Sequence, residues 1–268
     1  GKIIICMPGP PREMTRMFDK KIKPFLEEKS DGVIYYKMIR TIGIGESALE
    51  TVLLPLINGQ TDPTLATYAK EGECCLRIAS KRKTKREAES AVDDMLIKVK
   101  NIIGQHIYSE DDEELADVVS KILVEKNISV SVAESCTGGL FSGRLVDFPG
   151  ISSIFNRGIT TYSNIAKIEE LGVKLETLEK FGAVSEETAI EMAEGLKKKT
   201  GSRLCISVTG IAGPDGGSKE KPVGLIYLGV VFDDKIISKK ILLRNMGRKW
   251  VRSRAVFAMF SMIYDIIK

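Results

Sequence analysis

Hydrophobic and polar residues recur with two different periods along this chain, and the periods predict its elements. VIYYKMIRTI, from Val33, predicts a strand and GESALETVLLPLI a helix. TLATYAKEGECCLRIASK predicts two strands around a turn at Glu71 and Gly72, and apolar residues at helical spacing predict a helix over 85–103. The order strand, helix, strand, strand, helix indicates a small α+β domain.

A second pattern begins after the acidic stretch Glu110 to Glu114. ISVSVA, RGITTYS and RLCISVTG predict strands separated by helices, one of them over 185–198. PVGLIYLGVVF and KIISKKILL predict two more strands before a last helix over 248–267. This alternation predicts a three-layer α/β/α domain with a parallel or mixed sheet. Since like charges in a row resist packing, we expect domains at 31–109 and 110–268, with the boundary in the acidic stretch.

The first thirty residues predict too little structure to enclose a core. KIIIC predicts a strand, MPGPPREM a turn, and the segment from about Glu13 to Glu28 an amphipathic helix. We therefore interpret residues 1–30 as the C-terminal tail of a further domain, and we expect either that this piece packs on its neighbours or that the partner strands of KIIIC lie upstream of this sequence.

Composition places the chain among soluble globular proteins. Of its 268 residues, 43% are hydrophobic and 28% charged, and no apolar run is long enough to cross a bilayer. A net charge of +4 argues against a dedicated nucleic-acid binder. Five cysteines without CxxC spacing and a single histidine, His106, argue against a disulfide framework and a zinc site. We expect a cytoplasmic protein.

Three loops that follow predicted strands hold candidate chemistry, because ligands of open α/β sheets bind at the carboxyl ends of the strands. AESCTGG places Ser135 and Thr137 beside the start of a helix, where backbone amides hold phosphates or oxyanions. The same residues equally suit helix capping. TGIAGPDGG, from Thr209, has glycines that permit close approach of a ligand, although a plain connector has the same composition. TTYSN leads into a helix that carries Lys167.

These loops belong to a set of motifs that together resemble one family. AESCTGGL, GITTYSNIAK, GAVSEETA, SVTGIAGPDGG and KPVGLIYLGV occur in this order. They resemble the C-terminal domain of the CinA family, the competence or damage inducible proteins. That domain acts as an amidase, which converts nicotinamide mononucleotide to nicotinic acid mononucleotide and ammonia in pyridine nucleotide salvage. The resemblance also implies a homodimer.

The rest of the chain resembles the same family. RTIGIGESALE, TDPTLATYAKEGECCLRI and IYSEDDEEL are similar to its middle domain, which has a KH-like fold. MPGPPREMTRMF resembles the end of its N-terminal, molybdopterin-binding-like domain. The expected architecture is thus a three-layer α/β/α amidase domain preceded by a small KH-like α+β domain.

The resemblance implies three catalytic residues. Ser135 is the expected nucleophile, Lys167 the base that accepts its proton, and Tyr162 orients the lysine or the substrate. Amide hydrolysis needs a nucleophile and a proton shuttle, and a lysine with a depressed pKa serves as shuttle where no histidine is available. With His106 beside the domain boundary we expect no Ser-His-Asp triad. Capping or phosphate binding by Ser135, and core packing by Tyr162, are the structural alternatives.

A second set of residues is expected to bind the substrate. Thr209 would bind the carboxamide or nucleotide with its hydroxyl group, and glycine amides would face the phosphate or oxyanion. Arg248 stands where the family often has Gly-Asp-Arg, but this chain reads Gly247-Arg248, so Arg252 is an alternative phosphate ligand. The predicted substrate-binding residues are Glu134, Thr137, Gly138, Gly139, Thr209, Gly210, Arg248 and Arg252. We interpret Cys136 as a small buried side chain, and we predict no metal and no cofactor.

Two other functions stay open, a non-catalytic nucleotide-binding module and a KH-type RNA-binding protein. KH domains grip nucleic acid through a GxxG loop with basic flanks. The nearest sequence here is Gly43-Ile44-Gly45, and no GxxG stands at the required place. The basic run Lys81 to Arg86 could meet phosphates, although most such runs are only hydrated. We predict a small-molecule nucleotide as the partner, and neither nucleic acid nor a membrane.

Overall fold

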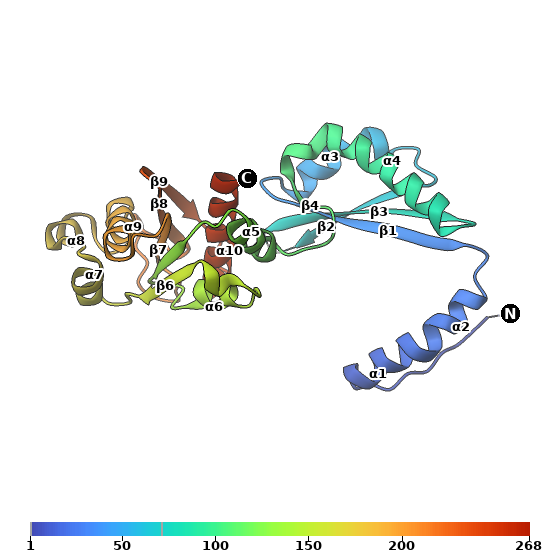
Figure 1. The fold of residues 1–268 in the computed structure, drawn as a ribbon, viewed down its shortest axis with the longest axis horizontal. Helices are drawn as coiled ribbons and strands as arrows, with labels where there is room; N and C mark the ends of the chain where they lie inside the picture. Colours follow the sequence, from blue (N-terminus) through green and yellow to red (C-terminus); the bar gives the residue numbers. More distant parts are fainter. Residues whose placement is uncertain (1, 71) are drawn as a thin grey trace. The chain divides into compact units, whose positions relative to one another are not determined.

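The computed structural model describes residues 2–70 and 72–268 (Figure 1). The chain divides into two compact units, unit 1 ending at Asp112 and unit 2 running from Glu113 to Lys268. The division falls inside the acidic stretch Glu110 to Glu114. Whether residues 1–30 belong to a further domain stays a prediction.

The strand predicted for KIIIC is wrong for the residues that the structure describes. Residues 2–7 form no strand, and Ile4 is 89% exposed. A strand needs a neighbouring backbone with which to exchange hydrogen bonds, and no described residue pairs with this segment. Gly1 lies outside the described residues.

The helix predicted over 13–28 is present, but it is interrupted. It consists of α1 (Pro11–Met17), a π-helical turn η1 (Phe18–Ile22) and α2 (Lys23–Glu28). Pro24 has no N–H, and its ring excludes the carbonyl group of the preceding turn, so a wider turn accommodates it.

Unit 1 contains an antiparallel sheet with the strand order β2-β3-β1-β4. Its elements are β1 (Val33–Thr41), α3 (Glu46–Ile57), β2 (Thr64–Lys70), β3 (Glu73–Arg82), α4 (Lys85–Ile103), a 3-10 turn (Gly104–His106) and β4 (Ile107–Ser109). The arrangement βαββαβ is the split βαβ motif. The predicted α+β domain is confirmed. Strand β4 was not predicted, because three residues are too few to show a period. Glu71 of the predicted turn lies outside the described residues.

Helices α3 and α4 of unit 1 lie on the same face of its sheet (Figure 1). Ile39, Leu76 and Ile78 of the strands form a buried core with Leu49 of α3 and Val92 of α4. A capping box of Thr84 and Glu87 fixes the start of α4.

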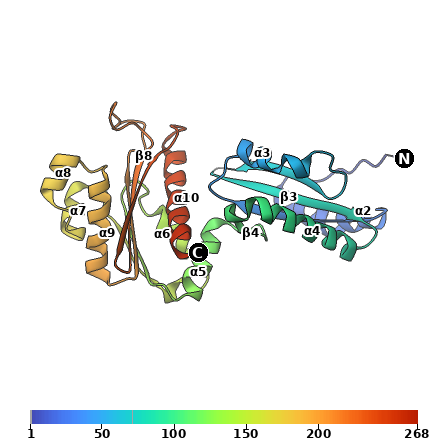
Figure 2. The same ribbon diagram turned by 90° about the horizontal axis from the view of Figure 1, so that it is seen from above.

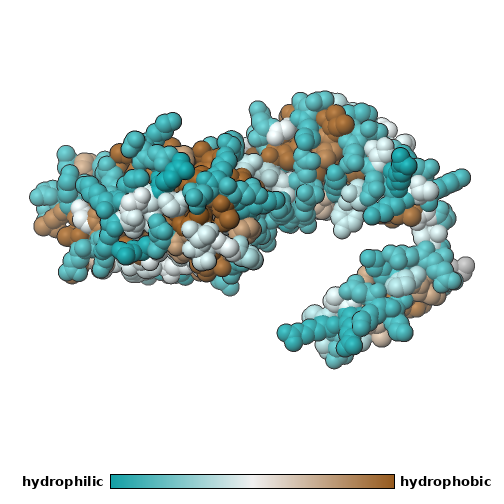
Figure 3. Space-filling model, viewed as in Figure 1, coloured by the Kyte–Doolittle hydropathy of each residue, from teal (hydrophilic) through white to brown (hydrophobic). Residues whose placement is uncertain are grey.

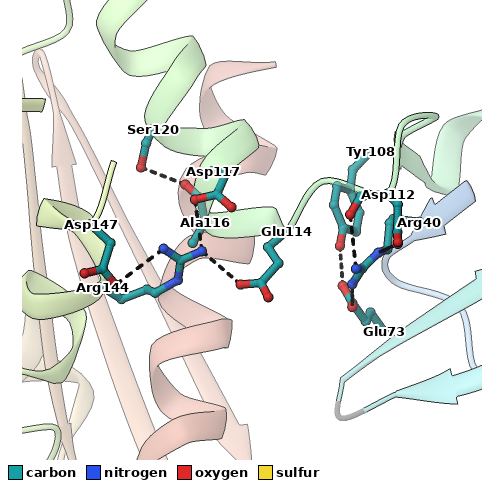
Figure 4. Close-up of polar contacts among 10 residues, drawn as sticks. All are labelled: Arg40, Glu73, Tyr108, Asp112, Glu114, Ala116, Asp117, Ser120, Arg144 and Asp147. Carbon is teal, nitrogen blue, oxygen red and sulfur yellow. Dashed lines mark hydrogen bonds and ion pairs between the residues drawn. The ribbon is translucent and has the colours of Figure 1, made fainter. Parts of the chain in front are cut away.

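A buried ion cluster lies at one end of this sheet (Figure 4). Arg40 is 7% exposed, with Nη1 2.5 Å from Glu73 Oε1 and Nε 2.6 Å from Asp112 Oδ1. The Tyr108 hydroxyl also donates to Glu73. Burial, and then the neighbouring Glu73 carboxylate, raise the pKa of Tyr108 well above its usual range. Through Asp112, the last residue of unit 1, the cluster ties the end of this unit to its sheet.

Unit 2 contains a five-stranded mixed sheet with the order β6-β5-β7-β8-β9. Its elements are α5 (Leu115–Glu125), β5 (Val130–Glu134), α6 (Leu140–Val146), a 3-10 turn (Ile151–Ser153), β6 (Phe155–Thr160), α7 (Asn164–Leu171), α8 (Leu175–Phe181), α9 (Glu186–Thr200), β7 (Leu204–Gly210), β8 (Leu225–Phe232), β9 (Lys235–Leu242) and α10 (Arg248–Ile267). Helices α7, α8 and α9 cover one face, and α5, α6 and α10 the other (Figure 2). The predicted three-layer α/β/α fold is confirmed.

Strand direction gathers the candidate loops of unit 2 at one edge of its sheet. Strand β5 is parallel to both neighbours, and its last residue, Glu134, is in register with Thr160 of β6 and Val208 of β7. The segments that follow these three strands therefore meet. Behind them, α9 lies close to α7, since a Cβ atom on Gly195 would lie 1.7 Å from Leu171 O.

The surface of each unit is mainly hydrophilic in the view of Figure 3, with smaller hydrophobic areas. Across the described ranges 2–70 and 72–268, no helix has the length and apolar character needed to cross a bilayer.

Candidate active site

A serine and a lysine from two adjacent loops meet at the carboxyl end of β5. Ser135 directly follows β5, and Lys167 lies in the first turn of α7, whose start is capped by the Ser163 hydroxyl. Side chains on a helix tilt toward its N-terminus, so Lys167 points back toward the strand ends. Its Nζ lies 3.1 Å from Ser135 Oγ. The structure thus brings the predicted nucleophile and base within proton-transfer distance.

Lys167 is buried without an ionic partner. The residue is 1% exposed and forms no ion pair with any residue that the structure describes. Its Nζ donates to Thr161 O at 2.9 Å and to Tyr162 O at 3.4 Å. Burial lowers its pKa from the usual 10.5, because a buried ammonium loses its hydration. In the neutral amine, two hydrogens serve these carbonyls and the lone pair is left for the Ser135 hydroxyl.

Glu134 has an internal role beside this pair. It is 1% exposed, and its carboxylate accepts hydrogen bonds from the N–H groups of Gly139 (3.0 Å), Phe141 (3.1 Å) and Ser142 (2.9 Å) and from the Ser142 hydroxyl (2.7 Å). The Glu134 carboxylate therefore already occupies the N-terminus of α6, where an anionic ligand would otherwise bind. These bonds weigh against the predicted contact of Glu134 with substrate, which stays a prediction.

The backbone conformation of this loop requires glycine at positions 138 and 139. Gly138 and Gly139 have φ angles of +60° and +93°, which residues with a Cβ rarely adopt. The Gly138 N–H donates to Ser135 O at 3.1 Å, and the Gly139 N–H to Glu134. Both amides are thus engaged within the loop, which weighs against the predicted contact with the phosphate or the oxyanion; that contact stays a prediction.

Two arginines of α10 reach the loops, and the structure separates their roles. Arg252 donates from Nε to Cys136 O at 3.0 Å and from Nη2 to Thr137 O at 2.7 Å, so it fixes the loop that carries the serine. Arg248 is exposed and donates to Gly213 O at 2.8 Å and to the Tyr162 hydroxyl at 2.7 Å. Tyr162 is 59% exposed, so it does not pack in the core.

The loop after β7 is anchored by hydrogen bonds to the segment between α8 and α9. The Thr209 hydroxyl, 1% exposed, donates to Ala183 O at 2.7 Å. Gly210 is a glycine because a Cβ there would lie 2.8 Å from Leu225 O. Lys221, which is not among the predicted site residues, donates from Nζ to Phe181 O (2.5 Å) and Val184 O (2.8 Å). Only its place in the KPVGLIYLGV motif could have indicated this role.

Two buried hydroxyl groups beside the pair lack hydrogen-bond partners. Thr137 Oγ1 and Thr161 Oγ1 are 0% exposed and make no hydrogen bond within the described part of the chain. Thr137 stands two residues after Ser135, and Thr161 donates its N–H to Glu134 O at 2.9 Å. Unsatisfied buried groups are rare and often mark the position of a ligand or water. Thr161 was not predicted, since nothing in TTYSN separates its two threonines.

The other nucleophilic and metal-binding groups do not join this site. Cys136 is buried, and burial raises the pKa of its thiol to about 12, as expected of a small core side chain. His106 belongs to unit 1, where its Nδ1 lies 3.1 Å from Ile42 O. In residues 2–70 and 72–268, no group of three or more His, Cys, Asp or Glu side chains is placed to hold a metal ion.

Comparison with known proteins finds similarity over nearly the whole chain. Residues 112–267 match the model of the CinA C-terminal domain, and residues 36–109 that of the damage-inducible protein CinA KH domain. A competence-damage inducible protein of Clostridioides difficile (strain 630) is 50% identical over 95% of this chain and 62% of its own length. A CinA-like protein of Dictyoglomus turgidum is 47% identical over 91% of this chain and 59% of its own. The chain thus spans about three fifths of these relatives.

Solved structures resemble a little over half of the chain. The competence/damage inducible protein CihA from Agrobacterium tumefaciens has a TM-score of 0.56 and 39% identity, and the match covers 57% of this chain and 94% of that one. A competence-damaged protein (CinA) superfamily protein from Klebsiella pneumoniae has a TM-score of 0.55 and 28% identity, with coverage of 57% and 95%.

Proposed function

The chain belongs to the CinA family, and from this premise we propose that it hydrolyses the carboxamide of nicotinamide mononucleotide to nicotinic acid mononucleotide and ammonia. The supporting observation is the buried Ser135–Lys167 pair, 3.1 Å apart and without a carboxylate on the lysine. The choice of substrate rests on the resemblance of the family motifs. The activity belongs to the α/β/α unit.

The proposed first half-reaction forms an acyl-enzyme. Neutral Lys167 accepts the hydroxyl proton while Ser135 Oγ attacks the carboxamide carbon, and the carbonyl π electrons move to oxygen. When the intermediate collapses, the C–N bond breaks and the Lys167 ammonium protonates the nitrogen, which leaves as ammonia. In the second half-reaction Lys167 takes a proton from water as the water oxygen attacks the ester carbon. The ester C–O bond then breaks, the Lys167 ammonium returns the proton to Ser135 Oγ, and nicotinic acid mononucleotide leaves.

The developing oxyanion has candidate donors in the same loop. The N–H groups of Cys136 and Thr137 make no hydrogen bond to another described residue, unlike those of Ser135, Gly138 and Gly139. An amide that directly follows a nucleophilic serine is a common oxyanion donor. Arg252 holds the carbonyl groups of Cys136 and Thr137 and so fixes the orientation of this segment.

Of the two arginines, Arg248 is the better candidate for the phosphate group. Arg252 is partly buried and donates to the nucleophile loop, whereas Arg248 is exposed and keeps further N–H groups for a ligand. Arg248 also donates to the Tyr162 hydroxyl. A phosphate bound to Arg248 would therefore also influence the position of Tyr162, which is next to Thr161 in the chain.

The decisive experiment measures ammonia and nicotinic acid mononucleotide released from nicotinamide mononucleotide. Ser135→Ala should lower turnover by about a thousandfold or more, because the attacking oxygen is lost. Ser152→Ala, which removes an exposed hydroxyl of the same unit, is the matched control and should leave turnover unchanged.

Calorimetric titration of the nucleotide separates catalysis from binding. Wild-type protein that binds the nucleotide firmly and releases no ammonia would refute the proposal and favour a nucleotide-binding module. Full activity in Ser135→Ala would contradict the serine mechanism.

A further inference from the structure

The sheet of unit 1 has a second face, opposite α3 and α4, that bears aromatic and basic side chains. Along β1 and β3, Ile39, Leu76 and Ile78 pack into the core, so the alternating residues point the other way. Among these, Tyr36 is 56% exposed and Ile34 is 66% exposed.

A hollow on this face lies between strands. It is lined by Ile34, Tyr36, Thr61, Asp62, Thr64, Arg77, Ala79, Ser80 and Lys81. Ala79 of β3 pairs with Tyr36 of β1 on one side and with Thr64 of β2 on the other. The small alanine side chain between two larger ones leaves room for a flat group against the Tyr36 ring.

The cations around the hollow are suited to a polyanion. Arg77 lies over the Tyr68 ring, 5.8 Å from its centre, and forms no ion pair with any residue in the described ranges. The basic run Lys81 to Arg86 begins at the same hollow, while its last two cations, Lys85 and Arg86, belong to α4 and Lys85 pairs with Glu89. The carboxylate that lines the hollow, Asp62, is paired with Arg82, while Lys81 pairs with Asp31 in an exposed contact.

We propose that this face binds single-stranded nucleic acid, with an unpaired base stacked on Tyr36 and phosphates held by Arg77, which lies over Tyr68, and by the basic run. Aromatic side chains on an open four-stranded sheet of βαββαβ topology provide stacking platforms, and stacking tolerates every base. A second copy of this chain would bring two basic faces together, so charge favours the polyanion.

This sheet face binds in a different way from a KH-type loop. The missing GxxG loop excludes a KH-type grip on the backbone, and the net charge of +4 describes the whole chain. Neither observation concerns this sheet face, whose hollow is lined by Arg77 and Lys81. The site is also independent of the proposed hydrolysis, which belongs to unit 2.

The test titrates the full chain into fluorescently labelled oligouridylate and oligodeoxythymidylate and follows anisotropy at several salt concentrations. Tyr36→Ala should weaken binding by about tenfold, whereas Tyr36→Phe, which keeps the ring, should bind like wild type. Arg77→Ala should weaken binding and reduce the salt slope by about one. Lys98→Ala removes an equal charge from α4, on the opposite face, and should change nothing.

The outcomes are distinguishable. Tighter binding of oligouridylate assigns RNA, and equal binding assigns single strands of either kind; both support the proposal. Absence of binding at low salt overturns it, as does equal binding of duplex, which would show attraction by charge alone. Equal affinity of Tyr36→Ala and wild type, with unchanged circular dichroism, also overturns it. So does a sedimentation mass that falls from dimer to monomer in Tyr36→Ala, since a second copy would then cover the face.

Discussion

Among the residues that the structure describes, each unit buries one cation, and the two cations have opposite surroundings. In unit 1, Arg40 contacts the carboxylates of Glu73 and Asp112 (Figure 4). In unit 2, Lys167 contacts one hydroxyl and two carbonyl oxygens, and no described carboxylate pairs with it. Arg40 is therefore held in its charged form, whereas the charged form of Lys167 is disfavoured.

The difference shows how burial can serve either stability or chemistry. A compensated guanidinium connects strands and cannot give up its proton in a protein. An uncompensated amine is driven toward its neutral form, in which it can take a proton from Ser135. Both cations are buried, and of the two only Lys167 lacks a carboxylate partner among the described residues. The absence of a counter-ion therefore indicates a reactive group more clearly than burial alone does. The following substitutions test this comparison.

Replacing Lys167 should have the largest effect. Lys167→Met should lower turnover of nicotinamide mononucleotide by about a thousandfold, because the proton acceptor is lost. Lys167→Arg keeps the positive charge but cannot deprotonate, so it should be equally inactive. Thermal unfolding should change little in Lys167→Met, since an apolar side chain replaces an unpaired buried cation. Substantial activity in Lys167→Arg would contradict the role of a base.

The pH dependence of turnover should report the same group. Because only neutral Lys167 accepts a proton, kcat/KM should rise with pH up to the lowered pKa of Lys167 and level off below 10.5. Between that pKa and 10.5 the unfolded chain binds more protons than the folded one, so the stability of unit 2 should also rise with pH. A midpoint at or above 10.5 would show that burial does not depress this pKa.

Replacing Arg40 should affect stability and leave the hydrolysis unchanged. Arg40→Met leaves the Glu73 carboxylate buried without its cation, which should cost about 3 kcal/mol. Urea unfolding followed by circular dichroism should show the loss, while fluorescence of Trp250, the single tryptophan, follows unit 2 alone. The double variant Arg40→Met with Glu73→Met should regain part of the loss. An equal shift in the Trp250 transition would contradict an effect confined to unit 1.

Glu134→Gln should have an intermediate effect and separates two roles for this residue. The amide cannot accept all four hydrogen bonds at the start of α6, so unit 2 should lose roughly 1–3 kcal/mol. If Glu134 only holds the loop, kcat should fall because Ser135 shifts, while nucleotide affinity stays near wild type. A large loss of affinity with kcat unchanged would restore the predicted contact with substrate.

Replacing Arg144 should have the smallest effect. Its guanidinium lies 2.9 Å from both Glu114 and Asp117, but these carboxylates are 63% and 39% exposed (Figure 4). Arg144→Met should cost less than about 1 kcal/mol in thermal unfolding, and the difference should shrink at high salt. A cost equal to that of Arg40→Met would show that exposure does not distinguish these clusters.

The sequence predicted most of both folds, because long periodic segments carry their own signal. The last helix occupies residues 248–267, as predicted, and the five strands of unit 2 lie where alternation or apolar runs placed them. The short elements were missed. Strand β4 has three residues and α8 has seven, and a period cannot be established over so few positions.

The candidate site was predictable in its residues but not in its internal bonds. Motif resemblance indicated Ser135 and Lys167, which the structure places together. It could not show that Glu134 occupies the helix start, or that Arg252 bonds the loop while Arg248 stays exposed, because these depend on contacts between segments distant in sequence. The unpartnered hydroxyl of Thr161 is likewise visible only once burial is known.

The close approach of α9 to α7 ties the accuracy of the site to a remote position. Gly195 lies beneath the end of the helix that carries Lys167, and even an alanine there would overlap Leu171 O. Any larger side chain would push the C-terminal end of α7 away from α9. Because α7 moves as a rigid helix, the Lys167 amine near its N-terminal end would move away from Ser135. A mutational library of this unit should therefore find position 195 nearly invariant among active clones, although it contributes no atom to the reaction.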